Sequence, residues 1–164
     1  MNPLGRSRLL FVLKFVTALA IAIALLSLTL VDDHVVRPFS QVQTKAAGIV
    51  LRAARQNVKA AGTLLIQSSY AVDVKNGCNG IEAIALLISA LAAFPAPWRS
   101  RLAAIIAGGV LVVAVNIIRI ASLFVILRDY PKAFEFMHVV VWQVALFLLV
   151  IGFFVKWSSR YATR

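Results

Sequence analysis

The chain has 164 residues, 62% of them hydrophobic, and its formal net charge is +11. A soluble domain is usually about 45–50% apolar, so a core of this length cannot hide so much apolar surface, and a lipid bilayer must solvate part of it. A basic chain suits nucleic acid or an anionic membrane surface, and the hydropathy decides for the membrane and against nucleic acid. The single cysteine, Cys78, excludes an intrachain disulfide.

Four apolar runs predict an all-α integral membrane protein with about four transmembrane helices, forming one polytopic domain over residues 1–164. The predicted spans cover residues 9–31, 79–98, 102–127 and 138–155. The first run is too long for the apolar region of a signal peptide, so we expect it to remain as a helix. Four spans place both termini on one side, and the basic residues close to the span ends on that side predict that the termini are cytoplasmic.

Residues 32–77 form a predicted extracytoplasmic segment between the first two spans. Within 36–66, apolar residues recur at steps of three and four, at Phe39, Val42, Ala46, Ile49 and Ala53. Basic residues recur every seven positions away from that stripe, at Lys45, Arg52 and Lys59. This pattern predicts an amphipathic helix, which either lies on the outer leaflet or packs on the bundle with a solvated charged face.

The end of this segment has a different pattern. Tyr70, Val72 and Val74 alternate with polar or small residues, which predicts a short extended piece. Asn76-Gly77 predicts a turn that leads the chain to Cys78.

Arg119 is the most costly residue in the predicted spans. An arginine at the centre of a membrane helix costs about 2.5–3.5 kcal/mol on insertion scales, so such a residue usually has a function. Asn116 and Ser122 lie three residues before and after it, so all three share one helix face. The structural alternative is an ion pair of Arg119 with Glu82 that locks two helices together.

The topology brings three reactive residue types to one side of the membrane. Cys78 lies at the outer end of the second span, His138 at the outer start of the fourth, and Arg119 in the outer half of the third. A histidine can take the proton of a thiol and a cation can stabilise the resulting thiolate, which is the nucleophilic form. Taken singly, the cysteine also fits as a packing residue and the histidine as a solvated interfacial residue.

The remaining ionisable residues have several interpretations. Glu82, one turn after Cys78, is either the counter-ion of Arg119 or a proton carrier. His34 follows Asp32-Asp33 at a span end, where we expect an interfacial loop. Their spacing matches no metal motif, so the sequence predicts no metal and no cofactor.

These residues resemble a known family. The run at 76–82, with Cys78-Asn79-Gly80 at its centre, resembles the cysteine motif of the exosortases, in which many relatives have serine where this chain has Asn79. Asn116 and Arg119 resemble the family's Asn-x-x-Arg motif, and His138 stands where the family histidine lies. The resemblance covers roughly residues 60–155, and the short four-span layout is most similar to the compact exosortase H branch.

The resemblance implies a membrane-embedded cysteine protease or transpeptidase of the bacterial inner membrane, with its site facing the periplasm. Its substrates would be exported proteins that end in a sorting tail: a short motif, of the Ile-Pro-Thr-Leu kind in this branch, then a transmembrane helix and a basic end. The implied catalytic residues are Cys78, Arg119 and His138. The supporting positions are Asn116, Glu82, Asn79 and Gly80.

Two other classes of function remain open at this point. A small proton-coupled transporter would use Glu82 and would not need Cys78. A non-catalytic membrane scaffold would depend on no single polar residue. The acceptor that resolves an acyl-enzyme is also open, so both hydrolysis and transpeptidation fit.

Overall fold

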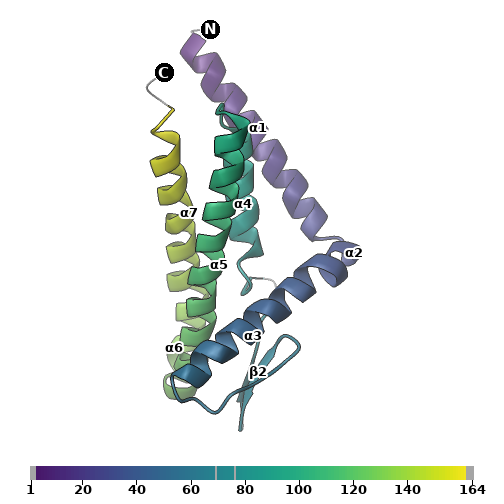
Figure 1. Cartoon of the computed structure of the whole chain (residues 1–164), viewed down its shortest axis with the longest axis vertical. Helices are drawn as coiled ribbons and strands as arrows, with labels where there is room; N and C mark the ends of the chain where they lie inside the picture. The colour runs from purple at the N-terminus through teal and green to yellow at the C-terminus, as the bar shows by residue number, and fades with distance from the viewer. Residues whose placement is uncertain (1–2, 69, 76, 162–164) are drawn as a thin grey trace.

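The computed structural model describes residues 3–68, 70–75 and 77–161, and it is mostly helical (Figure 1). Within these residues, three helical stretches are long and apolar enough to cross a membrane: Ser7–Leu26 of α1 (Pro3–Leu26), α5 (Trp98–Asp129), and the continuous stretch Pro131–Ser158. A shorter apolar helix, α4 (Ile81–Ala93), lies between the first two in the chain. The predicted all-α membrane fold class is confirmed, with one small sheet as an addition.

The first helix ends earlier than the apolar run at 9–31 predicts. After Leu26 the chain turns and re-enters helix as α2 (Thr29–Val31), the π-helix η1 (Asp32–Val36) and α3 (Arg37–Ala53). The expectation of a loop at Asp32, Asp33 and His34 is therefore wrong, because all three lie in η1. Arg37 reaches back one turn to Asp33 at 2.9 Å and so supports this segment electrostatically.

Residues 59–73 form a three-stranded antiparallel sheet, whereas the sequence predicts helix up to residue 66. Its strands are β1 (Lys59–Ala61), β2 (Leu64–Gln67) and β3 (Tyr70–Asp73), in the order β1-β2-β3. Gly62, with φ of 60°, makes the tight turn between the first two strands. The predicted extended piece at 70–74 corresponds to β3.

Helix α3 turns an unexpected face towards the protein. Its buried residues are small or polar in the main: Ser40, Gln43, Thr44, Ala47, Gly48 and Leu51. Two members of the apolar stripe, Val42 and Ile49, are 65% and 61% exposed. The stripe is therefore free to contact lipid, and a second, polar stripe faces the rest of the molecule.

Helix α4 is the central helix of the bundle and packs against α1, α5 and α7 (Trp142–Ser158). Its 13 residues rise about 20 Å, against the ~30 Å of a bilayer's hydrocarbon core. Pro95 and Pro97 end the helix, so it is shorter than the predicted span at 79–98. Because α5 is much longer, α4 begins well short of the C-terminal end of α5.

The sheet and α3 lie beside the half of the bundle that is away from the start of α1 and the end of α7 (Figure 1). They share a core with the C-terminal half of α5, in which Leu51, Leu65 and Val74 pack with Ile120 and Phe124. A separate core between α4, α5 and α7 holds the bundle together.

The last helical stretch begins at α6 (Pro131–Phe136), not at His138 as the hydropathy predicts. Tyr130 separates it from α5, and Pro131 fits the first helical position because its missing N–H would have no helical partner there. His138 consequently lies about two turns, or ~10 Å, inside the helical stretch. It belongs to a second π-helix, η2 (Met137–Val141). Such irregular turns are frequent at functional sites.

Candidate active site

The loop that carries Cys78 is a compact turn held by its own backbone. The carbonyl oxygen of Lys75 accepts hydrogen bonds from the N–H groups of Cys78 at 2.9 Å and Asn79 at 3.1 Å. Gly77 has φ of 82°, as a turn at this point requires, while its predicted partner Asn76 lies outside the described residues. The Oδ1 atom of Asn79 then accepts the N–H of Ile81 at 3.1 Å, which forms a local turn around Gly80, the N-cap residue of α4.

Gly80 is required on two grounds. Its φ of 71° lies in the left-handed region, and a Cβ added there would be 3.0 Å from Cγ of Asn116. Asn116 approaches so closely because its Nδ2 donates to the carbonyl oxygen of Cys78 at 2.9 Å. The glycine thus allows α5 to contact the loop that carries Cys78 directly.

Arg119 is 1% exposed and ties together the two segments that carry Cys78 and His138. Its Nη2 donates to the carbonyl oxygens of Gly77 at 2.9 Å and His138 at 3.3 Å. Among the described residues no carboxylate lies within ion-pair distance of it. Glu82 is exposed and accepts the N–H of Gly77 at 2.9 Å, so the ion pair considered from the sequence does not form.

Gln43 on α3 belongs to the same network and was missed by the sequence analysis. Its Nε2 donates to the carbonyl oxygen of Asn79 at 2.6 Å, and its Oε1 accepts from Asn116 at 2.9 Å. Nearby, Asn79 donates to Ser40 at 3.0 Å. The available signal was the second stripe on this helix, in which small and polar residues recur at steps of three and four.

Cys78 and His138 line one cavity of about 290 Å³. The imidazole stacks on Phe134, with ring centroids 5.7 Å apart, and its Nε2 is buried with no hydrogen-bond partner among the described residues. Cys78 is 6% exposed. Burial raises the pKa of its thiol above the ordinary value, while the charge of Arg119 acts in the opposite direction.

At the mouth of the cavity, Asp73 binds Lys75 at 2.8 Å and accepts from Thr63 at 2.7 Å. Burial acts to raise the pKa of this carboxyl, but the bonds from Lys75 and Thr63 outweigh it and hold the pKa below its usual value. The residue therefore stays ionised at neutral pH.

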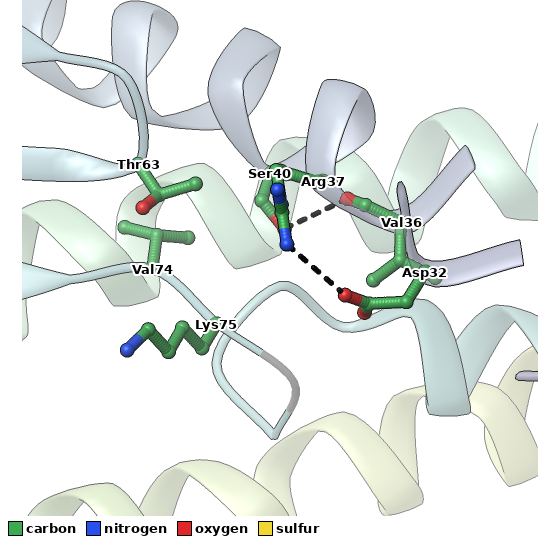
Figure 2. Close-up of a pocket in the computed structure, with 7 residues that line it drawn as sticks. All are labelled: Asp32, Val36, Arg37, Ser40, Thr63, Val74 and Lys75. Atoms are coloured by element: carbon green, nitrogen blue, oxygen red, sulfur yellow. Dashed lines mark hydrogen bonds and ion pairs between the residues drawn. The ribbon is translucent and has the colours of Figure 1, made fainter. Parts of the chain in front are cut away.

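A second cavity, of about 380 Å³, shares Lys75 with the first (Figure 2). Arg37 points towards the Asp32 carboxylate on one side of this cavity, and the Lys75 side chain lies apart from that pair. Ser40 donates to the carbonyl oxygen of Val36, one turn earlier in the chain. Thr63 and Lys75 bind Asp73, which lies outside this lining, so the polar side chains of the second cavity already have partners.

The arrangement supplies the parts of a thiol-dependent acyl transfer. A thiol and an imidazole nitrogen without a partner among the described residues share a cavity, and the buried Arg119 guanidinium bonds to the backbone at Gly77 and His138. Ser122, on the same face of α5, donates to the carbonyl oxygen of Arg119 and takes no part. Within the described residues there is no cluster of three or more His, Cys, Asp or Glu side chains suited to a metal ion.

Comparison with known families matches residues 5–155 to the family described as transmembrane exosortase. The matched region covers nearly the whole chain and includes Cys78, Arg119 and His138. No curated protein and no solved structure shows significant similarity to the chain.

Proposed function

Because the chain belongs to the transmembrane exosortase family, we propose that it is a multi-pass membrane cysteine peptidase or transpeptidase that cleaves C-terminal sorting tails from exported proteins. The observation that carries this proposal is the single cavity lined by both Cys78 and His138. It supports the residue roles expected from the resemblance.

In this proposal the Sγ of Cys78 attacks the carbonyl carbon of the scissile peptide bond. Nε2 of His138 takes the thiol proton and then gives it to the leaving amine, so that a thioester and a free amine are formed. Water or a second nucleophile then releases the acyl group. A base is needed because burial keeps the resting thiol protonated near neutral pH.

Arg119 acts in this proposal mainly by position and charge. Its hydrogen bonds hold the backbone before Cys78 and at His138 in a fixed relation. Its charge stabilises the thiolate and the oxyanion that develops on the substrate. Asn116, Asn79, Gly80 and Glu82 support the nucleophile loop, and no cofactor takes part.

The start of α1 and the end of α7 lie at one end of the bundle, and the sheet lies at the other (Figure 1). The distribution of basic residues supports placing the termini in the cytoplasm and the cavity on the periplasmic side of a bacterial inner membrane. A substrate tail would then lie beside the helices with its own basic end in the cytoplasm.

The test is the processing of a tailed reporter in cells that express the wild-type chain, Cys78→Ala or Cys78→Ser. We expect cleavage with the wild type only, at equal membrane abundance of all three chains. A thioester-linked reporter that is released by hydroxylamine would identify the nucleophile. Normal processing by Cys78→Ala would overturn the proposal.

A further inference from the structure

The outer edge of β3 forms one wall of the cavity that holds Cys78 and His138. β3 is the last strand in the sheet order, so one of its edges pairs with β2 and the other faces away from the sheet. Ala71, Val72 and Asp73 of this strand line the cavity. An edge strand presents unpaired backbone groups and is a template for a further strand.

The register identifies which backbone groups face outwards. In an antiparallel pair, residues that bond to the partner strand alternate with residues whose N–H and C=O point away. The N–H of Val74 donates to Thr63 at 2.9 Å, which continues the register Leu65↔Val72 and Ile66↔Ala71. Ala71 and Asp73 therefore direct their backbone groups away from β2.

These outward groups are largely unpaired. The carbonyl oxygen of Asp73 accepts from the N–H of Lys75 at 3.2 Å. In the part of the chain that the structure describes, the N–H and C=O of Ala71 and the N–H of Asp73 have no backbone partner. Ala71 is exposed and Asp73 is half-buried, so these groups are accessible to a bound peptide, which would replace water as their hydrogen-bond partner.

We propose that the substrate peptide around the scissile bond binds as an extended strand along β3, hydrogen-bonded to the backbone of Ala71 and Asp73. This inference rests on the proposed function and specifies the bound conformation of its substrate. Main-chain hydrogen bonds give such strand addition its affinity, and alternate side chains give it specificity. Apolar side chains of the peptide contact Leu127 and Phe134, which line the same cavity.

The added strand runs parallel to β3. From β3 the chain passes from the sheet into the bundle, where it begins α4 (Figure 1). A substrate with its folded part outside and its transmembrane segment after the cleavage site must run in the same direction. Ala71 and Asp73 are about 6.6 Å apart along the strand. In a parallel pair each bonds to the residues before and after the one opposite it, so their bonds go to alternate residues within about three to five substrate positions.

Cross-linking tests the bound conformation. In a Cys78→Ser background, Ala71→Cys is paired with single cysteines at six consecutive positions of the reporter, just before its transmembrane segment. We expect disulfides at every second position, because strand side chains alternate in direction. Lys59→Cys, on the opposite edge of the sheet, is the matched control and should give none. Recurrence every three or four positions, uniform cross-linking, or cross-linking only to Lys59→Cys overturns the proposal.

A second experiment removes one hydrogen bond. Ala71→Pro deletes the outward N–H, at a position where an edge strand tolerates proline, and Ala71→Ser retains it. We expect reporter cleavage by Ala71→Pro to be roughly tenfold slower than by Ala71→Ser. The rate at which iodoacetamide alkylates Cys78 reports whether the site is intact in both. Equal cleavage rates of the two variants overturn the proposal, and if the proline variant loses the site, the cross-linking pattern decides.

The two levels of inference fail separately. A reporter that the wild-type chain leaves uncut, or that Cys78→Ala cuts normally, contradicts the proposed function and removes the basis for strand addition with it. Cysteine-dependent cleavage without the alternating pattern contradicts strand addition alone.

Discussion

Asn116 on α5 donates a hydrogen bond to Gln43 on α3 at 2.9 Å, and both side chains are fully or almost fully buried. Gln43 also donates to the carbonyl oxygen of Asn79, next to Cys78. One side chain therefore links helix α3, the Cys78 loop and the bundle. Gln43 contacts neither Cys78 nor His138, so we regard it as a positioning residue.

Replacing Gln43 by alanine should slow reporter cleavage by about 5- to 150-fold, since losing buried hydrogen bonds costs about 1–3 kcal/mol. Gln43→Glu keeps the acceptor for Asn116 but puts a buried carboxylate oxygen against the carbonyl oxygen of Asn79, so its rate should fall at least as far as that of Gln43→Ala. Val42→Ala, one residue away and exposed, is the control and should cleave at close to the wild-type rate. Equal rates for all three variants would contradict a positioning role.

Gly80→Ala and Gly62→Ala form a matched pair that separates strain from contact. Both glycines have positive φ, 71° and 60°, so alanine at either site costs about 1–2 kcal/mol. Only Gly80 has a neighbour, Asn116, that a Cβ would meet at 3.0 Å. Gly80→Ala should therefore lose more thermal stability than Gly62→Ala and should also lose cleavage, as measured by melting in detergent and by reporter processing. Similar losses in both assays would mean that the contact with Asn116 is unimportant.

Hydropathy predicts the membrane class and the approximate apolar runs, because apolar composition over 20 residues is a local property. It does not predict that the last helix begins at Pro131, since Lys132 and Glu135 dilute the apolar signal there. Helix α4 is short because prolines follow it and the Cys78 loop precedes it. Its N-terminal end is set by the tertiary hydrogen bonds of that loop, which the sequence does not reveal.

The sequence names candidate residues for a site, but it could not predict their contacts. Topology alone brings Cys78, Arg119 and His138 to one side of the membrane. Which face of α3 is buried depends on partners far away in sequence, and a pattern based on apolar residues selects the face with Val42 and Ile49, which is exposed. The role of Glu82 could not be predicted either, because its partner is the backbone N–H of Gly77.

The pH dependence of Cys78 alkylation should reflect its buried position. Burial raises the pKa of the thiol, so the rate should rise with pH and reach its midpoint above that of an ordinary free cysteine, about 8.5. Arg119 favours the thiolate, so Arg119→Gln should move the midpoint to still higher pH. The measurement is the rate of Cys78 alkylation by iodoacetamide over roughly pH 6 to 11. A midpoint that falls on removal of Arg119 would contradict this electrostatic role.

Variants of Glu82 distinguish the peptidase from a proton-coupled transporter. The carboxylate accepts the N–H of Gly77 at 2.9 Å, and a glutamine can accept the same bond. Glu82→Gln should therefore retain most of the reporter cleavage, and Glu82→Ala should lose more of it because the turn before Cys78 is less well held. A transporter that protonates Glu82 gives the opposite result, with function abolished by Glu82→Gln and unaffected by Cys78→Ala.

The short central helix also sets the depth of the reaction. Arg119 lies ten residues before Asp129, the end of α5, so it meets the Cys78 loop about 15 Å below that end. For a peptidase acting at Cys78, this depth selects the peptide bond that is cut, because only that bond reaches Cys78. The length of α4, 13 residues, sets the depth. Four residues inserted into α4 would raise the nucleophile by about 6 Å, separate it from Arg119, and leave the substrate's own cleavage point out of register.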